Sequence, residues 1–209
     1  MAANLILTGK AVDATFCEET HTYTTASGRR IPSVSKVIKP LTEGVYGAID
    51  PEVLRRAADF GTAVHACTEY LDLGELDDES IEPEWAPYVD AYRAFLVDFK
   101  PNYLGIELRL ACEKYAGTLD RYAEIDGDLW VIDLKTTSAI HPHVGVQLAG
   151  YEGLLRANYA HIGSQQIRLA AVQLRGDGTY RFHEFGKMDD KACFNALLTL
   201  TSWKENHHD

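Results

Sequence analysis

The fold is decided by one stretch of the sequence, residues 117–135, which reads GTLDRYAEIDGDLWVIDLK. Asp126-Gly127 lies between two runs of alternating polar and apolar residues, and this dipeptide favours a two-residue type I′ hairpin turn. If the residues on either side of it close the turn, counting outward along both strands places Asp120 opposite Asp133. The stretch therefore predicts two antiparallel strands that bring two carboxylates together.

The chemistry of this hairpin depends on one of its faces. Directly opposed residues on one face have Cβ atoms about 4.5–5.5 Å apart. Two carboxylates at that separation repel each other unless a cation lies between them, and they suit a shared hard metal ion. Lys135 follows Asp133 by two positions and projects from the same face, whereas Ile132 and Leu134 point the opposite way into a core. The hairpin predicts a metal site beside a lysine.

The Asp-x-Lys triplet at the end of this stretch carries little information by itself, because acidic and basic residues are common. The chain has two more such triplets, Asp98-Phe99-Lys100 and Asp189-Asp190-Lys191. The alternative interpretation is an exposed, solvated hairpin face. A site is favoured only because the triplet lies on a strand paired with a second acidic strand.

Length and composition predict a single domain over residues 1–209. The chain is 46% hydrophobic, which is enough for a substantial core, and no Pro/Gly/Ser-rich linker divides it. We expect residues 1–100 to cover the core, residues 104–185 to carry its motifs and a helix over residues 189–204 to follow. No apolar run is long enough to cross a membrane, and the N-terminus lacks a signal-peptide pattern. A cytoplasmic protein without membrane contact is expected.

Two classes of cofactor are excluded by missing motifs. There is no Walker-type glycine-rich loop, so no nucleotide cofactor is expected. The four cysteines are scattered without a Cys-x-x-Cys pair, which argues against a structural zinc site or an iron–sulfur cluster. They are expected to remain reduced, mainly as small buried residues, at positions Cys17, Cys67, Cys112 and Cys193.

The net charge of −11 opposes nucleic-acid binding, because phosphate contacts normally come from a basic surface. A bound divalent metal would cancel part of this charge at the site, and a short basic strip would then suffice. Much of the excess negative charge lies in residues 72–84, which are expected to form a solvated loop. The candidate basic strips are Arg29, Arg30, Lys36 and Lys39, and Arg55 with Arg56.

Periodicity and turn residues give the order of the elements. Strands are predicted over residues 5–17, 21–25, 104–112, 117–125, 128–136, 167–174 and 180–185. Ser33 is predicted to cap a short helix that runs through Lys39, and further helices are predicted over residues 52–71, 83–99 and 144–156. The last four residues are expected to fray. This order predicts an α/β fold, in which helices flank a mixed sheet with an antiparallel meander at its centre.

Four short motifs follow one another along the chain: GTAVH at 61–65, GTLD at 117–120, DLKT at 133–136 and QLAGY at 147–151. In this order they resemble the PD-(D/E)XK nuclease superfamily, in particular its RecB-type exonuclease branch. HTY at 21–23 and IPSVS at 31–35 also resemble phage-encoded members and mitochondrial genome-maintenance exonucleases. The resemblance covers roughly residues 20–185.

This resemblance implies a function and its setting. The expected core is restriction-endonuclease-like, and the expected activity is metal-dependent hydrolysis of DNA from single-stranded or duplex ends. Phage-type recombination, replication or DNA processing is the implied context, with a recombination or replication protein as a partner and the host cytosol as the compartment. The proline that is common before the first acid in this branch is missing before Asp120, and the cysteine quartet of cluster-binding relatives is absent.

The resemblance also assigns a metal site. Asp120, Asp133 and the backbone carbonyl of Leu134 would hold Mg²⁺ or Mn²⁺, because hard divalent cations prefer oxygen ligands. His65 would add an imidazole ligand, which suits Mn²⁺ better than Mg²⁺, and Glu107 would be a further acid. The alternatives are a packed or solvated histidine and an exposed strand glutamate.

Further roles concern the reaction and the substrate. Lys135 would orient or activate the attacking water and counter the charge that grows on the phosphate. Gln147 and Tyr151 share a helix face, where Gln147 would support the lysine or the DNA backbone. A surface lysine and a core tyrosine are the corresponding alternatives. The residues expected to contact DNA are Tyr151, Thr136, Arg55 and Arg56.

Two other functions stay open. A catalytically silent or partner-activated module that binds DNA ends would keep the same fold, and the acidic net charge favours it. A different metal-dependent hydrolase could use His141, His143 and His183 with nearby acids. These histidines lack the His-Glu-x-x-His spacing that would fix two ligands on one helix face, and His141-Pro142-His143 is expected in a loop before the helix that carries Gln147.

Overall fold

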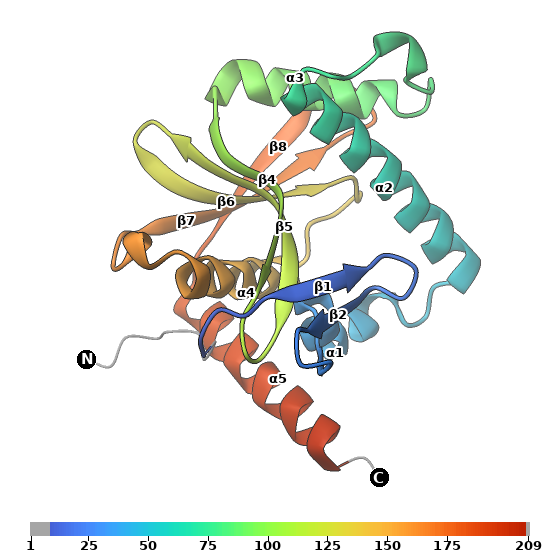
Figure 1. The fold of residues 1–209 in the computed structure, drawn as a ribbon. Coiled ribbons are helices and arrows are strands. Elements are labelled where there is room, and N and C mark those ends of the chain that lie inside the picture. The colour runs from blue at the N-terminus through green and yellow to red at the C-terminus, as the bar shows by residue number, and fades with distance from the viewer. Residues whose placement is uncertain (1–8, 208–209) are drawn as a thin grey trace.

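A computed structural model describes residues 9–207 and contains a five-stranded sheet in the order β4-β5-β6-β7-β8. Strands β6 and β7 are parallel and every other neighbouring pair is antiparallel. The predicted mixed sheet with a central antiparallel meander is therefore confirmed (Figure 1). The strands are β4 (Asn102–Ala111), β5 (Ala116–Ile125), β6 (Asp128–Lys135), β7 (Ile167–Leu174) and β8 (Tyr180–Phe185).

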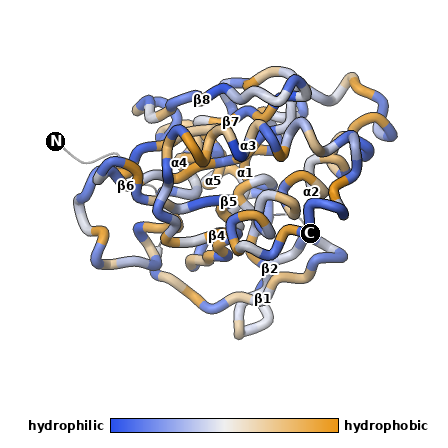
Figure 2. The backbone as a smooth tube through the Cα atoms, turned by 90° about the horizontal axis from the view of Figure 1, so that it is seen from above, coloured by the Kyte–Doolittle hydropathy of each residue, from blue (hydrophilic) through white to orange (hydrophobic). Residues whose placement is uncertain are grey.

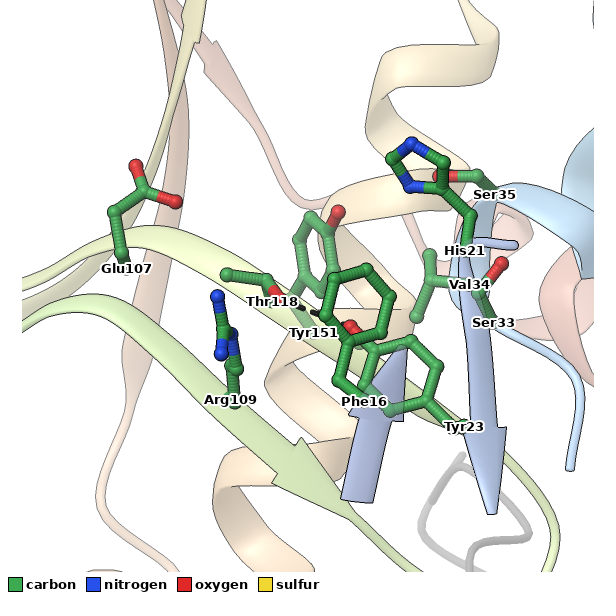
Figure 3. Close-up of a pocket in the computed structure, with 11 residues that line it drawn as sticks. Phe16, His21, Tyr23, Ser33, Val34, Ser35, Glu107, Arg109, Thr118 and Tyr151 are labelled. Atoms are coloured by element: carbon green, nitrogen blue, oxygen red, sulfur yellow. Dashed lines mark hydrogen bonds between the residues drawn. The ribbon is translucent and has the colours of Figure 1, made fainter. Parts of the chain in front are cut away.

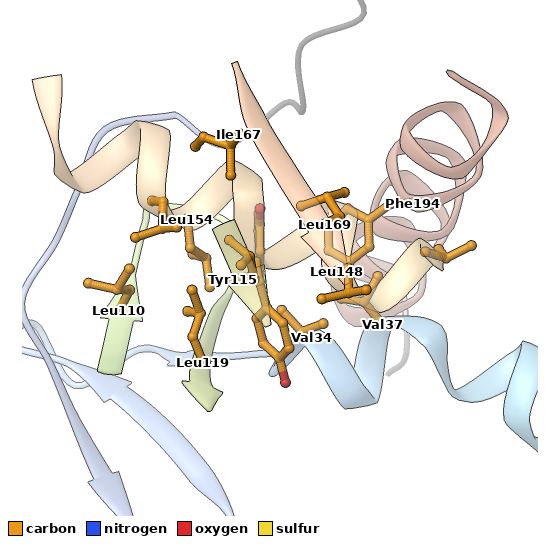
Figure 4. Packing of buried hydrophobic residues seen from close by; sticks show 14 of the residues in the cluster. Val34, Val37, Leu110, Tyr115, Leu119, Leu148, Leu154, Ile167, Leu169 and Phe194 are labelled. Carbon is orange, nitrogen blue, oxygen red and sulfur yellow. The ribbon is translucent and has the colours of Figure 1, made fainter. Parts of the chain in front are cut away.

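Helices cover both faces of this sheet. One face packs against α1 (Val34–Tyr46), α4 (His143–Asn158) and α5 (Met188–His207), and Figure 4 shows this core with the rings of Tyr115 and Phe194 near its centre. The other face packs against α2 (Pro51–Leu73) and α3 (Ala86–Phe99). Because the sheet is buried on both faces, alternate residues of one strand enter different cores.

The central hairpin has the predicted register. The pairs run from Ile125 with Asp128 to Arg121 with Ile132, and Asp120 and Asp133 are the next residues beyond the last pair. Asp126 and Gly127 have φ of +51° and +84°, the left-handed values that both central residues of a type I′ turn require. Ile132 and Leu134 enter the core beneath α2 and α3, as expected.

Helix α2 carries His65 to the sheet, and its ends follow from local sequence. The Asp50 side chain accepts a hydrogen bond from the Glu52 amide at 2.8 Å, and Pro51 occupies the first helical position. Gly74 ends the helix with φ of +71°. The predicted helix over residues 52–71 is confirmed and extended by one residue at its start and two at its end.

A second, three-stranded antiparallel sheet contains β1 (Ala14–Cys17), β2 (Thr22–Thr25) and β3 (Arg30–Ile31). Figure 2 shows β1 and β2 on the β4 side of the molecule, away from β7 and β8. Over residues 9–13 the predicted strand 5–17 is wrong, because residues 10–12 bond to the end of β4 and the loop after it rather than to β2. Residues 5–8 lie outside the described residues.

Helix α1 differs from its prediction. It was expected to end at Lys39, but it continues through Pro40 to Tyr46. Proline removes one helical hydrogen bond and disfavours the helical conformation of the residue before it. Burial of Val34, Val37 and Ile38 against α4 and the sheet outweighs that penalty. The predicted Ser33 cap is confirmed, since its hydroxyl accepts from the Lys36 amide at 3.1 Å.

Four smaller findings complete the fold. The acidic segment over residues 72–84 was expected to be solvated, but Asp72 lies inside α2 with a buried side chain. Helix α5 continues to His207, so the expected fraying of residues 206 and 207 is wrong, and residues 208–209 lie outside the described part of the chain. The four cysteines are free; Cys67 and Cys112 are buried and Cys17 is exposed. Within residues 9–207 no helix has the length and apolar content to cross a membrane.

Candidate functional site

Three neighbouring strands place acidic residues side by side. Ile106 pairs with Arg121 and Leu108 with Leu119, so Glu107 of β4 lies opposite Asp120 of β5. On the other side of Asp120, the register of the central hairpin leads to Asp133 of β6. The sheet therefore aligns Glu107, Asp120 and Asp133 across its width, which no single strand pattern could predict.

His65 of α2 joins two of these acids. The ligating atoms of His65, Glu107 and Asp120 all lie within 4.8 Å of one another, and we call these three residues the acid–histidine cluster. His65 Nδ1 is 3.7 Å from Asp120 Oδ2, and His65 Nε2 is 3.1 Å from the carbonyl oxygen of Leu134. The Leu134 amide donates to Asp120 Oδ2 at 2.6 Å. Four predicted metal ligands are thus brought to one place.

The donors and charges of this cluster fit a divalent cation. Two carboxylates, an imidazole and a backbone carbonyl are the ligands that Mn²⁺ and Mg²⁺ accept in proteins. Burial, reinforced by the charge of Asp120, raises the pKa of Glu107 well above its usual range, although Arg121 opposes the shift. A cation between these carboxylates would relieve their repulsion.

Glu107 has an unusual backbone conformation. Its φ is +45°, a left-handed value that residues with a side chain rarely adopt within a strand. Such a conformation costs about 1–3 kcal/mol and persists only where the surrounding structure enforces it. The distortion lies where Glu107 faces Asp120, and the Glu107 carboxylate lies within reach of His65.

Asp133 is held differently from the acid–histidine cluster. It is almost completely buried, and its Oδ2 lies 2.6 Å from Lys135 Nζ in an ion pair. Among the described residues, that oxygen has no hydrogen bond of good geometry. The structure therefore directs Asp133, which was predicted to be a metal ligand, toward Lys135 and places it outside the acid–histidine cluster.

Lys135 lies at the start of a chain of polar contacts. Its Nζ donates to Gln147 Oε1 at 3.2 Å, and Gln147 Nε2 donates to the Tyr151 hydroxyl at 3.1 Å. Burial alone would lower the pKa of Lys135, but the charges of Asp133 and Asp120 outweigh it and raise that pKa above its usual value. Lys135 is therefore an ammonium group at neutral pH, held in place from two sides.

Sequence reasoning missed Arg121, which is fully buried beneath the cluster. Its guanidinium donates to Asp72 Oδ2 at 2.6 Å, to Glu107 Oε1 at 3.1 Å and to the carbonyl oxygen of Asp120 at 2.7 Å. It also donates to Thr68 Oγ1 at 3.1 Å. The sequence offered one signal of its burial: Arg121 lies two residues before Ala123, on the strand face that enters the core. Arg121 fixes one acid of the cluster and the backbone of another.

The predicted DNA-contacting residues lie in different places. Thr136 Oγ1 would be 3.5 Å from a Cβ at Gly61, so α2 passes close to the end of β6. Tyr151 is mostly buried beside Gln147. Arg55 and Arg56 pair with Glu52 on the exposed face of α2, about 15 Å along the helix axis before His65. The structure does not bring these two arginines to the cluster.

The N-terminal basic strip is also engaged in local contacts. Lys36 pairs with Glu205 at 2.8 Å, and Lys39 pairs with Glu43 at 3.4 Å. Arg29 donates to the carbonyl oxygen of Glu113. These cations therefore offset nearby acidic and carbonyl oxygens rather than forming an open basic surface.

The alternative histidine site does not assemble. His141 and His143 stack on each other with ring centroids 5.7 Å apart, and both meet the ring of Tyr46 edge-on. His183 Nε2 lies 3.2 Å from Gln173 Oε1. Across residues 9–207, the acid–histidine cluster is the one grouping of three or more metal-ligating side chains.

No protein-family model matches the chain, and no curated protein sequence matches it.

Proposed function

We propose that the protein is a metal-dependent DNA exonuclease of the PD-(D/E)XK type, which hydrolyses phosphodiester bonds from DNA ends. The observation that carries this proposal is the convergence of His65, Glu107 and Asp120 beside the Asp133–Lys135 pair. These residues come from one helix and three strands, and they include members of three of the four motifs that resemble this superfamily. Gln147, from the fourth motif, contacts Lys135.

His65, Glu107, Asp120 and the carbonyl oxygen of Leu134 would hold Mg²⁺ or Mn²⁺. When bound, such an ion lowers the pKa of a coordinated water and stabilises negative charge on a phosphate. Arg121 holds Glu107 and the Asp120 backbone in place from below, and the Leu134 amide holds the Asp120 carboxylate. The chain itself therefore fixes the geometry of the donor atoms.

Lys135, the last residue of β6, provides a positive charge beside Asp133. Because it is an ammonium group, it acts as a hydrogen-bond donor to a phosphate oxygen or to the attacking water, not as a proton acceptor. Asp133 keeps it protonated, and Gln147 limits its rotation. A fixed donor near developing negative charge lowers the barrier without having to reorganise during the reaction.

The test uses end-labelled linear and circular DNA, each single-stranded and duplex, with Mg²⁺, Mn²⁺ or EDTA. We expect linear substrates to be shortened from their ends, circles to survive and EDTA to stop the reaction. Asp120→Asn should abolish cleavage, whereas Asp59→Asn on the exposed face of α2 should not. Metal-independent cleavage, or full activity of Asp120→Asn, would contradict the assignment of the site.

The net charge of −11 favours a second candidate, a silent or partner-activated module that binds DNA ends. It predicts end-dependent binding in the same titrations without cleavage in any metal. Addition of a cell extract that restores cleavage to the wild type, but not to Asp120→Asn, would indicate activation by a partner.

A further inference from the structure

A pocket of about 540 Å³ opens next to the acid–histidine cluster. Its walls come from the β1–β2 hairpin on one side and from β4, β5 and α4 on the other. Figure 3 shows Phe16, His21 and Tyr23 from the hairpin, with Arg109 between them and Glu107. Glu107 belongs both to this pocket and to the cluster.

The hairpin wall of the pocket is aromatic. The ring of Phe16 lies 4.7 Å from that of Tyr23 and 5.7 Å from that of His21, measured between centroids. Phe16 is half-buried and His21 is exposed. His21 lies at the end of the hairpin loop and has a left-handed φ of +47°. Tyr23 is buried behind them, so Phe16 and His21 are the rings of this wall that reach solvent.

Arg109 adds a cation to this wall. It lies two residues after Glu107 on β4, and its guanidinium carbon is 5.2 Å from the centroid of the Phe16 ring. More than half of its side chain is exposed, and its partner Glu18 is an exposed residue of the hairpin loop. An exposed ion pair of this kind contributes little stability, so Arg109 can exchange Glu18 for another anion.

One contact joins the hairpin to the five-stranded sheet, and one close approach joins that sheet to α4. The Tyr23 hydroxyl and Thr118 Oγ1 are 2.8 Å apart, which joins β2 to β5 two residues before Asp120. A Cβ at Gly117 would lie 2.9 Å from the ring of Tyr151, so the absence of a side chain there lets α4 approach. The pocket is therefore held at a constant position relative to Asp120 and Lys135.

We propose that this pocket binds an unpaired nucleobase of single-stranded DNA, next to the phosphate that is held at the acid–histidine cluster. The inference rests on the proposed nuclease function and specifies its substrate as a single strand or an unpaired end. A base exposes both faces for stacking on aromatic rings only when it is unpaired, and such stacking tolerates any sequence. Stacking also supplies affinity that does not depend on a basic surface.

Arg109 has a defined part in this arrangement. It lies between the aromatic wall and Glu107, where the backbone of a strand would pass from the stacked base toward the cluster. Its guanidinium can donate to a phosphate oxygen while it stays near the Phe16 ring. The pocket thus offers one group for a base and one for its phosphate.

The experiment measures binding of a fluorescent oligothymidine with Ca²⁺ in place of Mg²⁺, and a gel confirms that the probe stays intact. Abasic sites are placed at one position at a time. We expect one position to weaken wild-type binding about ten-fold. The same abasic site should have no further effect on Phe16→Leu, which binds the intact probe about ten-fold more weakly. Phe16→Tyr should retain tight binding, and Trp203→Leu, an exposed aromatic of α5, is the control.

Two results would overturn the inference: equal loss from the abasic site in wild type and Phe16→Leu, or equal affinity for a duplex of the same length. His21→Ala, at an exposed position, gives a second test, and thermal melts confirm that the variants fold. The readout is binding, so it is separate from the cleavage that tests the proposed function. If DNA is cleaved but the abasic site has the same effect in wild type and Phe16→Leu, only the proposed base pocket is ruled out. If the effect of the abasic site depends on Phe16 but no DNA is cleaved, only the proposed hydrolysis is ruled out.

Discussion

Arg121 and Lys135 are both cations beside the same acidic residues, but they differ in what can reach them. The Arg121 side chain has no exposed surface and lies beneath the sheet among Asp72, Glu107 and Thr68. The Lys135 side chain is 22% exposed and pairs with Asp133, which is itself buried. One cation is sealed by protein on all sides, and the other keeps one side open.

This difference in exposure separates a cation that organises the protein, Arg121, from one that can meet a substrate, Lys135. The five donors of a guanidinium match several fixed acceptors at once, which suits a residue that organises acids inside a protein. An ammonium on a flexible stem suits a group that must also meet a substrate. We therefore expect changes at Arg121 to act mainly on folding and changes at Lys135 mainly on cleavage.

The largest expected effect is on stability, in Arg121→Met. The substitution leaves the buried Asp72 and the half-buried Glu107 without their cation, and breaking a buried pair such as Arg121–Asp72 costs about 3–5 kcal/mol. Urea unfolding measures the loss in free energy of unfolding. Arg175→Met removes an exposed pair with Asp177 and should change it by less than about 1 kcal/mol. Similar losses in both variants would contradict the distinction between sealed and exposed arginines.

Lys135→Ala should have the next largest effect, on the rate of cleavage. Removal of one fixed donor to developing charge lowers kcat by about 10²–10³-fold. The rate on end-labelled DNA measures this, with circular dichroism to confirm the fold and Lys204→Ala on α5 as the control. An unchanged rate in Lys135→Ala would show that the open cation takes no part in the reaction.

Gln147→Ala should have a smaller effect on the same rate. Gln147 accepts from Lys135 and donates to Tyr151, so its loss frees the ammonium without removing the charge. A hydrogen bond to a charged group contributes about 1.5–3 kcal/mol, and the lower value corresponds to a roughly 10-fold lower kcat. Gln166→Ala, in an exposed loop, is the matched variant. A loss as large as that of Lys135→Ala would assign Gln147 a direct role in the reaction.

The smallest expected effect is the dependence of DNA binding on salt. Only cations that reach solvent can contact DNA phosphates and release their counterions. Of the three cations near the site, Lys135 and Arg109 meet this condition and Arg121 does not. Two phosphate contacts give a slope of about −1.4 for log K against log[salt] on a single strand. Titration of oligothymidine at several NaCl concentrations measures this slope. A slope steeper than about −3 would require a basic surface elsewhere on the protein.

Local sequence was sufficient for the parts of the site that lie close together along the chain. The Asp126-Gly127 turn sets the register that points Asp120 toward Asp133, and the spacing of Gln147 and Tyr151 predicts their contact. It was insufficient for Glu107, because the strand alternation could not show a left-handed φ or the approach of His65 from α2. It also misjudged Asp72, since an acidic residue near a helix end is usually solvated unless a distant arginine binds it.

The sequence by itself determined the mixed sheet, the central hairpin and the ends of α2, because turn residues, caps and alternation act within a few residues of one another. Only the tertiary structure decided that His65, Glu107 and Asp120 converge, that Arg121 lies sealed beneath them and that α1 continues past Pro40. It also placed Phe16 and Arg109 beside Glu107. These arrangements depend on the packing of helices and strands that are far apart in the chain, and the free energy of that packing is not contained in any local pattern.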